Sequence, residues 1–571
     1  YDKIIDLIKA GMNVARLNFS HGTREGHLKS INLLKQARME LEVPLAIMLD
    51  TRGPEVRLGE IAGDGLSLSK GDKWHLVKQK VVGNKESVSI TPGEVLEGIP
   101  RGSRILFDDG YISSHVVEET SKGLIVEIDN GGVIRSGKGV NVPEVSLNLP
   151  SITEKDFEDI RFGGKHGVDI IAASFVRSAE NIMTIKDLLV EEKYDDILVI
   201  AKIENHEGIE NFDCILQVAD GVMIARGDLG VEIPLSRVPK LQKEMIRKCY
   251  HAGKPSVTAT QMLESMMYNP RPTRAEVSDV ANAIYDSTSV VMLSGETAVG
   301  KYPIETVQVM NSIIKEAEED FDYHTFFDFH SKSIYNDVPS AVALATVKTA
   351  YSSHAAAVFA LTDKGATARL LSRLRPAMPI LALTSYEKVY HQMAFNWGVT
   401  PVLGKKYKNF QEAFAKISEY AMEKQFVSYG DLVIVTAGST FGVTGTTNMM
   451  IVENIGDVLV RGFVGTGDRI YGNVRLLLST EKIKPYNVRG QLIVIPLCDE
   501  SYLPYMKEAG GIILQNHIDD VASETFLLEE AKLLSKPAIA RADAACNILR
   551  DGQLVTMDPE KALIYKGVVL D

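Results

Sequence analysis

Ile200-Ala-Lys-Ile-Glu-Asn-His-Glu-Gly208 and Gly221-Val-Met-Ile-Ala-Arg-Gly-Asp-Leu-Gly230 are the stretches that decide how this chain folds. Each begins with an apolar, β-branched run, which is typical of a buried parallel strand, and then changes to polar residues and glycine. The apolar residues of the intervening segment, 209–218, have helical spacing. Together they predict a strand–helix–strand unit with chemically active side chains at its strand ends.

Lys202 and Glu204 are two residues apart on the first predicted strand, so their side chains project from the same face of it. Asp228 ends the next strand, and neighbouring strands lie about 5 Å apart. We therefore expect Glu204 and Asp228 to share a divalent cation, and two carboxylates suit Mg²⁺, which keeps other positions for water and substrate oxygens. The competing interpretation is a set of solvated strand-end charges. Three such charges on adjacent strands, with Arg226 beside them, favour a site.

The whole chain has the composition of an ordinary globular protein, with 571 residues and 45% hydrophobic residues. This length predicts about three or four domains. The net charge of −13 argues against a nucleic-acid or anionic-membrane partner, and no apolar run is long enough to span a bilayer. The four cysteines have neither metal-ligand nor redox-motif spacing, which favours buried free thiols in a reducing compartment, the cytoplasm.

Apolar runs that end in polar residues recur through the first 335 residues and alternate with helical segments such as 25–40 and 236–251. This alternation predicts an α/β fold with a parallel sheet. Seven strands are expected: Val14–Ser20, Leu45–Asp50, Asp169–Ser174, Ile197–Ala201, Val222–Ala225, Ser256–Thr260 and Ser289–Ser294. A (β/α)₈ TIM barrel needs eight, and we expect the remaining strand upstream of Tyr1. In such barrels the chemistry lies at the C-terminal ends of the strands.

The pattern changes three times along the chain, which predicts further domains. Residues 1–55 and 150–335 form the barrel, and the short alternating strands and turn signals of 56–149 predict an inserted β-barrel lid over its active end. A second α/β domain is expected over 336–467. An extra C-terminal α/β domain is expected over 468–571.

Six motifs in order, each at a predicted strand end, give the chain a clear family resemblance. They are Met12-Asn-Val-Ala-Arg-Leu-Asn-Phe-Ser-His-Gly22, Leu49-Asp-Thr-Arg-Gly-Pro-Glu-Val-Arg57, Lys202-Ile-Glu-Asn-His-Glu-Gly208, Ala225-Arg-Gly-Asp-Leu-Gly-Val-Glu232, Ala259-Thr-Gln-Met-Leu-Glu-Ser265 and Met292-Leu-Ser-Gly-Glu-Thr297. Over nearly its full length the chain resembles the pyruvate kinases. The resemblance implies a homotetrameric cytoplasmic phosphotransferase of glycolysis that converts phosphoenolpyruvate and ADP to pyruvate and ATP.

The resemblance also assigns roles at the barrel. It implies that Glu204 and Asp228 bind Mg²⁺ or Mn²⁺, and that Lys202 lies beside the transferring phosphoryl group. The remaining implied substrate contacts are Arg16 on the phosphate, Gly227 and Asp228 near the carboxylate, and Thr260 near the carbon that is protonated.

For the other cofactors, the resemblance implies K⁺ ligands and nucleotide contacts. The K⁺ ligands are Asn18, Ser20, Asp50 and Thr51, and Glu55 accompanies K⁺ dependence in this family. The contacts with the nucleotide phosphates are Arg57 and, from the lid, Lys138. The competing interpretations are helix caps for Asn18, Ser20 and Thr51, and an exposed turn lysine for Lys138.

In the second α/β domain, the loop 362–367 joins a predicted strand to a helix, where hydroxyl and backbone N–H groups can bind a phosphate. The resemblance implies an allosteric site for a phosphorylated sugar or nucleoside monophosphate here, with 438–448 as a second loop. Its candidate residues are Thr362, Lys364, Gly365 and Thr367. The competing interpretation is a capped turn beside a flexible loop.

Two departures from the family pattern affect these expectations. Residues 286–289, Asp-Ser-Thr-Ser, lack the usual glycine and aspartate of that loop. The extra domain resembles the phosphohistidine domain of enzymes that use phosphoenolpyruvate, but the position for the histidine falls at Thr525-Phe526. His517 lies outside that register and is expected on the surface, so we do not expect the domain to carry a phosphoryl group.

Two rival functions remain open from the residues. One is a metal-dependent aldolase or lyase that handles a pyruvate enolate on a similar barrel, although such an enzyme needs no nucleotide-binding lid. The other is a catalytically silent, effector-binding homologue. The presence of Lys202, Glu204, Asp228 and Thr260 argues against it.

Overall fold

The computed structural model describes residues 1–143, 145–332, 337–438, 447–481 and 483–569. The chain divides into two compact units. Unit 1 comprises residues 1–344, 360–408 and 437–448, and unit 2 comprises 345–359, 409–436 and 449–571.

Unit 1 is built on a parallel sheet in the order β1-β2-β12-β13-β14-β15-β16. Its strands are β1 (Val14–Asn18), β2 (Ala46–Asp50), β12 (Ile170–Ala173), β13 (Leu198–Ile203), β14 (Gly221–Ala225), β15 (Ser256–Ala259) and β16 (Val290–Val291). These are the seven strands that the sequence predicts, so the α/β fold class is confirmed. Within the described ranges, no ladder pairs β1 with β16.

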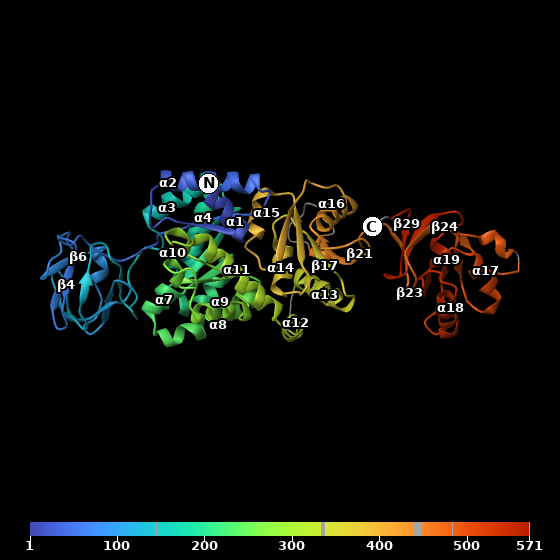
Figure 1. Cartoon of the computed structure of the whole chain (residues 1–571). Coiled ribbons are helices and arrows are strands. Elements are labelled where there is room, and N and C mark those ends of the chain that lie inside the picture. Colours follow the sequence, from blue (N-terminus) through green and yellow to red (C-terminus); the bar gives the residue numbers. More distant parts are fainter. Residues whose placement is uncertain (144, 333–336, 439–446, 482, 570–571) are drawn as a thin grey trace. The chain divides into compact units, whose positions relative to one another are not determined.

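Helices alternate with these strands along the chain (Figure 1). They are α1 (Asp2–Ala10), α2 (Arg24–Glu40), α3 (Glu154–Lys165), α4 (Ala179–Glu191), α5 (His206–Glu210), α6 (Phe212–Val218), α7 (Arg226–Glu232), α8 (Val238–Ala252), α9 (Arg274–Tyr285), α10 (Gly295–Ala298), α11 (Pro303–Glu319) and α12 (Tyr323–His330). The predicted helix over 209–218 is interrupted at Asn211, which ends α5 and begins α6.

Alternating residues of the strands pack into two separate apolar clusters. On β2, Met48 belongs to one cluster with Ile200 and Val257, whereas Ile47 and Leu49 belong to another that includes residues of α2 and α4. This is the period of two that strands impose, and both faces are apolar because both are covered. The near-continuous apolar runs of the sequence therefore follow from burial on both faces.

The segment between β2 and α3 contains strands and turns (Figure 1). Its larger sheet has the order β11-β7-β8-β9-β5-β6-β3, and β4 pairs with β10. The strands are β3 (Arg57–Leu58), β4 (Leu66–Leu68), β5 (Lys73–Val77), β6 (Ser87–Thr91), β7 (Arg104–Phe107), β8 (Ile112–Thr120), β9 (Gly123–Ile128), β10 (Gly132–Ile134) and β11 (Val140–Asn141). Trp74 and Phe107 meet edge to face in its core.

Residues 338–454 contain a five-stranded sheet in the order β19-β18-β17-β20-β21. Its strands are β17 (Ala357–Leu361), β18 (Ile380–Thr384), β19 (Val399–Leu403), β20 (Leu432–Gly438) and β21 (Thr447–Asn454). The helices of this segment are α13 (Val338–Ser352), α14 (Ala366–Arg373), α15 (Glu387–Met393) and α16 (Phe410–Glu423).

Within unit 1, α15 packs against the N-terminal ends of the barrel strands. Gln392 donates to the carbonyl oxygens of Asp169 and Asp196 at 2.9 and 2.7 Å, and His391 Nδ1 accepts the N–H of Leu45 at 3.2 Å. At the same end of the sheet, the Asp169 carboxylate forms an ion pair with Arg38 Nη1 at 2.8 Å. Buried polar groups at this end are therefore satisfied by one another.

The last segment is a mixed sheet in the order β22-β29-β28-β24-β25-β26-β27-β23. Its strands are β22 (Val458–Arg461), β23 (Val464–Thr466), β24 (Ile470–Leu476), β25 (Leu492–Ile495), β26 (Gly511–Leu514), β27 (Ala538–Ala540), β28 (Leu554–Asp558) and β29 (Leu563–Lys566). The helices are α17 (Leu503–Glu508), α18 (Val521–Leu533) and α19 (Ala545–Ile548). His517 is exposed, as predicted. Across the described ranges, no helix has the length and apolar character needed to cross a membrane.

The burial of His391 predicts a pH dependence of stability. Burial, followed by the charges of Arg38 and Lys35, lowers its pKa to about 3 from 6.5. The unfolded chain therefore binds more protons below pH 6.5, and this contribution to stability is lost as the pH falls from 6.5 toward 3. Between pH 7.5 and 5, the loss is at most about 2 kcal/mol.

We expect His391→Gln to weaken this pH dependence, because a glutamine oxygen accepts the Leu45 N–H without titrating. Urea unfolding at pH 7.5 and at pH 5, monitored with a spectroscopic probe in unit 1, measures the free energy of unfolding at each pH. His517→Gln, which removes an exposed histidine, is the control and should retain the wild-type slope. Equal slopes for the wild type and His391→Gln would contradict the assignment.

Candidate active site

Lys202 lies at the centre of a buried polar cluster at the C-terminal edge of the sheet. Its Nζ atom is 3.0 Å from Asp50 Oδ1, 3.0 Å from Glu204 Oε1 and 2.7 Å from Ser174 Oγ. Burial opposes the charged form of Lys202, but the attraction of Asp50 and Glu204 outweighs it and raises the pKa. Lys202 is therefore a permanent ammonium ion.

Asp50 is fully buried and is shared by two cations. Besides Lys202 on Oδ1, its Oδ2 atom accepts Arg16 Nε at 2.5 Å. Burial raises the pKa of the Asp50 carboxyl, and the two cations more than reverse this effect, so the pKa lies below its usual value. Asp50 thereby holds the Lys202 and Arg16 side chains toward the same point.

Ser174 completes this cluster, and sequence reasoning did not assign it a role. Its Oγ atom donates to the Thr51 carbonyl at 2.7 Å and accepts from Lys202, and its N–H donates to Thr51 Oγ1 at 3.1 Å. The one sequence signal was its position at the end of a predicted strand, which other strand-end residues share.

Glu204 and Asp228 form the predicted carboxylate pair. Glu204 Oε2 accepts the N–H of Phe175 at 2.6 Å, and Asp228 lies in the first turn of α7. Burial and then the charge of Glu204 raise the pKa of Asp228 to about 7. Lys202 relieves only part of this repulsion. Two crowded carboxylate groups fit a hard divalent cation, which would remove the rest.

In the ranges that the structure describes, His, Cys, Asp and Glu form no cluster of three or more with the geometry of a metal site. A cation held by Glu204 and Asp228 would thus keep most of its positions for water and substrate oxygens, which suits Mg²⁺.

Gly227 and Thr260 contact each other beside this pair. The N–H of Gly227 donates to Thr260 Oγ1 at 2.7 Å, and that hydroxyl donates to the Ala259 carbonyl at 2.6 Å. Thr260 has a φ of 67°, in the left-handed region that costs about 1–3 kcal/mol for such a residue. Arg226 supports this backbone by donating to the carbonyls of Ala259 and Thr260 at 3.1 and 2.7 Å.

The predicted K⁺ ligands lie together at the ends of β1 and β2. Asn18 is the register partner of Asp50, and Asn18 Oδ1 accepts the N–H of Ser20 at 3.0 Å. Thr51 is buried and bonded to Ser174. The structure therefore brings the four residues to one edge, while the oxygen atoms of Asp50 face Lys202 and Arg16. Their binding of K⁺ stays a prediction.

The predicted nucleotide contacts, Arg57 and Lys138, are neighbours in the inserted β segment, because Leu58 N–H donates to the Lys138 carbonyl at 2.9 Å. Arg57 Nε lies 2.5 Å from Glu55 Oε2, and Lys138 Nζ lies 2.8 Å from Asp108 Oδ1. Both cations are at least a third exposed and can exchange these carboxylates for other anions.

The predicted effector residues begin α14. Gly365 is its N-cap with a φ of 74°, which favours glycine, and Lys364 is exposed. Thr367 is buried, and its hydroxyl lies 2.6 Å from Thr447 Oγ1. Within the second predicted loop, residues 439–446 lie outside the described residues.

Comparison with known proteins identifies the family. The family described as "Pyruvate kinase, barrel domain" matches residues 1–307, and "Pyruvate kinase, alpha/beta domain" matches residues 340–453. Proteins named pyruvate kinase from Sporosarcina psychrophila, Bacillus licheniformis and Geobacillus stearothermophilus are 41%, 39% and 40% identical to the chain. The alignments cover 98%, 99% and 99% of this chain and 95%, 96% and 96% of those proteins. The chain belongs to the pyruvate kinase family of phosphotransferases.

Proposed function

We propose that this protein transfers the phosphoryl group of phosphoenolpyruvate to ADP, giving pyruvate and ATP in the cytoplasm as the last step of glycolysis. The observation that carries the proposal is the cluster of Lys202, Glu204 and Asp228 beside Thr260. Asp50 pairs with Lys202 and also with Arg16. A silent homologue has no need to keep a buried ammonium and two crowded carboxylates at this cost in free energy.

In this reaction, Glu204 and Asp228 hold Mg²⁺ or Mn²⁺, which supplies positive charge to the oxygens of the substrate when it is bound. Lys202 and Arg16 bind the phosphoryl group and neutralise the charge that develops as it moves to ADP. Asp50 fixes both cations in advance, so little reorganisation is needed in the transition state. The buried surroundings of Lys202 strengthen these interactions.

Protonation of the enolate occurs on the Thr260 side. The Gly227 N–H and the Arg226 bonds hold Thr260 in its left-handed conformation, which places its hydroxyl at a fixed point. We propose that Thr260, with a water or a relay, delivers the proton to the methylene carbon. The Asp228 N–H binds the substrate carboxylate, together with the Gly227 N–H once that group leaves the Thr260 hydroxyl.

The remaining assignments are part of the same proposal. Asn18, Ser20, Asp50 and Thr51 bind K⁺, and Arg57 and Lys138 bind the phosphates of ADP. The family relationship supports a homotetramer. It also supports activation by a phosphorylated sugar or nucleoside monophosphate bound at Thr362, Lys364, Gly365 and Thr367.

The first test of the function concerns the metal. We expect Glu204→Gln to reduce turnover by about 10²-fold or more, because one of two metal-binding carboxylates loses its charge. Initial rates with phosphoenolpyruvate and ADP across a Mg²⁺ series measure this. Glu210→Gln, which changes an exposed glutamate of α5, should behave as wild type. A folded Glu204→Gln variant with normal rates and Mg²⁺ dependence would refute the assignment.

A second test separates transition-state stabilisation from substrate binding. Lys202→Met should lower kcat by about 10³-fold or more with little change in KM, because the ammonium acts on charge that develops during transfer. Steady-state kinetics give both constants, and circular dichroism checks folding. Lys186→Met removes a lysine paired with Asp220 on the outside of the sheet and is the control. A change confined to KM would show that Lys202 only binds substrate.

The third test concerns K⁺. Replacing K⁺ by tetramethylammonium at constant ionic strength should lower activity at least about tenfold, equivalent to ~1.4 kcal/mol of activation free energy. NH₄⁺ should restore activity because its size is close to that of K⁺. Full phosphoenolpyruvate-dependent ATP formation without either ion argues against the K⁺ site but not against the reaction.

A further inference from the structure

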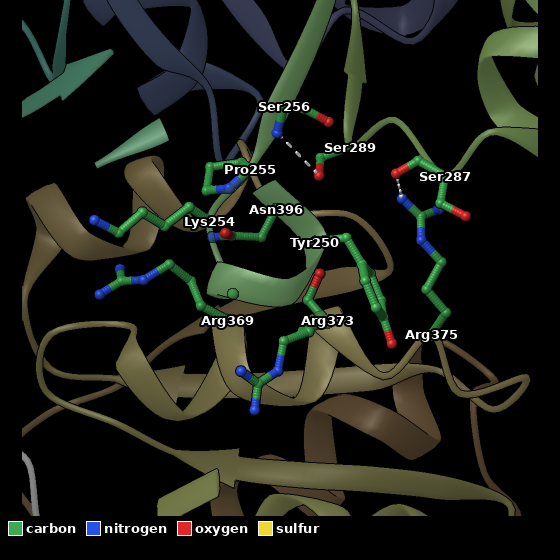
Figure 2. Close-up of a pocket in the computed structure, with 12 residues that line it drawn as sticks. Tyr250, Lys254, Pro255, Ser256, Ser287, Ser289, Arg369, Arg373, Arg375 and Asn396 are labelled. Carbon is green, nitrogen blue, oxygen red and sulfur yellow. Dashed lines mark hydrogen bonds between the residues drawn. The ribbon is translucent and has the colours of Figure 1, made fainter. Parts of the chain in front are cut away.

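A second polar cavity lies at the other end of β15 from Thr260 (Figure 2). It is small and partly open to solvent. Residues at the C-terminus of α8, at the starts of β15 and β16 and along α14 form its walls, all within unit 1. The active site uses the C-terminal ends of the same strands, so this cavity is separate from it.

The walls of this cavity carry positive charge without negative charge. Four lining residues are cations: Lys254, Arg369, Arg373 and Arg375. The others are Tyr250, Gly253, Pro255, Ser256, Ser287, Ser289, Ser372 and Asn396, which are neutral. Hydroxyl, amide and cationic donors around one space are the groups that bind phosphate.

Two of the cations have structural contacts. Arg375 Nη2 donates to the carbonyls of Ser287 and Thr288 at 2.6 and 2.7 Å and stacks on Trp397. These bonds hold Ser287 at a φ of 70°, at the loop where the sequence departs from its family. Lys254 Nζ donates to three carbonyls at the end of α6, those of Leu216, Gln217 and Ala219. Helix capping therefore accounts for Lys254, and loop support accounts for Arg375.

Arg369 is not accounted for in this way. Its Nη1 atom has a long bond of 3.4 Å to the Lys364 carbonyl. Among the described residues, no carboxylate forms an ion pair with Arg369, Lys254 or Arg375 within 4.0 Å. The charge of Asp220 acts on Arg369 and Lys254, but its carboxylate binds Lys186 at 2.9 Å and the Val199 N–H at 2.8 Å.

The arrangement of these cations is unfavourable without an anion. Burial lowers the pKa of Arg369, Lys254 and Arg375, that of Arg375 to about 10. The charge of Arg369 lowers the pKa of Lys254 further, and Figure 2 shows the two side chains extended with their cationic ends side by side. Adjacent buried charges of one sign are stabilised when an anion binds between them.

Arg373 brings a third guanidinium to the same cavity from the next turn of α14. It lies against Gly253, where an added Cβ would be 3.4 Å from Arg373 Nη1. One guanidinium group can donate two parallel hydrogen bonds to two oxygens of a phosphate, which an ammonium group cannot do. Arg369 and Arg373 are one helical turn apart, so they lie on the same side of the helix.

We propose that this cavity binds a phosphate group, either inorganic phosphate or the phosphate of a small monoester, through Arg369 and Arg373, next to the charge of Lys254. The serine hydroxyls at the starts of β15 and β16 supply further donors. Of the described residues, none from the proposed effector loop 362–367 lines this cavity, although Arg369 Nη1 donates to the Lys364 carbonyl of that loop at 3.4 Å.

Equilibrium dialysis of the full-length protein with radiolabelled inorganic phosphate tests the proposal at low ionic strength. The Arg369→Gln/Arg373→Gln double variant should bind one phosphate fewer per chain, or bind it at least about tenfold more weakly. The Thr362→Ala/Thr367→Ala variant of the effector loop and Lys29→Gln on the surface of α2 should keep this site. Equal binding by the wild type and the double arginine variant would overturn the proposal.

A second variant covers the case in which the arginine variant does not fold. Ser289→Asp places a carboxylate in the cavity, so it should abolish the same binding event and raise the Tm in phosphate-free buffer. Unchanged phosphate binding by folded Ser289→Asp would also overturn the proposal. Parallel dialysis with glycerol 3-phosphate separates the two sources: binding of both ligands assigns the cavity to a phosphomonoester, and binding of inorganic phosphate alone assigns it to the free ion.

Discussion

The buried ammonium group of Lys202 is the constraint on which the active end of the sheet depends. A buried cation needs carboxylates, and Lys202 has two within 3.0 Å, one from the end of β2 and one beyond the end of β13. Ser174, at the end of β12, fills the remaining side. Three adjacent strands must therefore end at the same level, which fixes the register of the sheet at this point.

The same constraint produces the crowding of Glu204 and Asp228. Glu204 contacts Lys202 with one oxygen and accepts a backbone N–H with the other, and it lies close to Asp228. Burial then raises the pKa of Asp228. Glu204 thus has two roles: it pairs with Lys202, and with Asp228 it forms the carboxylate pair proposed to bind a divalent cation. The family relationship explains why a chain keeps this arrangement.

The strand positions could be predicted because burial on both faces leaves a local mark, a continuous apolar run such as 197–201. Lys202 and Glu204 were predicted to be neighbours from a period of two, and the structure places them 3.0 Å apart. The prediction that Glu204 shares a cation with Asp228 assumed that their two strands are adjacent, which the sheet order bears out, and the shared cation itself stays a proposal.

Other features could not be predicted, because they depend on contacts between residues far apart in the sequence. Nothing local distinguishes Ser174 from an ordinary strand-end serine, and its role depends on Lys202 and Thr51. The left-handed backbone of Thr260 depends on Arg226 from the preceding strand end. Helical spacing over 209–218 did not show that Asn211 would end one helix and begin another.

The net charge of the chain does not predict the charge of each of its cavities. The chain carries −13, yet four cations and no carboxylate line the cavity at the start of β15. Lys254 and Arg375 hold backbone carbonyls, so this positive charge partly serves to complete helix and loop ends. Arg369 goes beyond that need. Because β15 joins this cavity to Thr260, the strand has an anion-attracting group at one end and a proposed proton donor at the other.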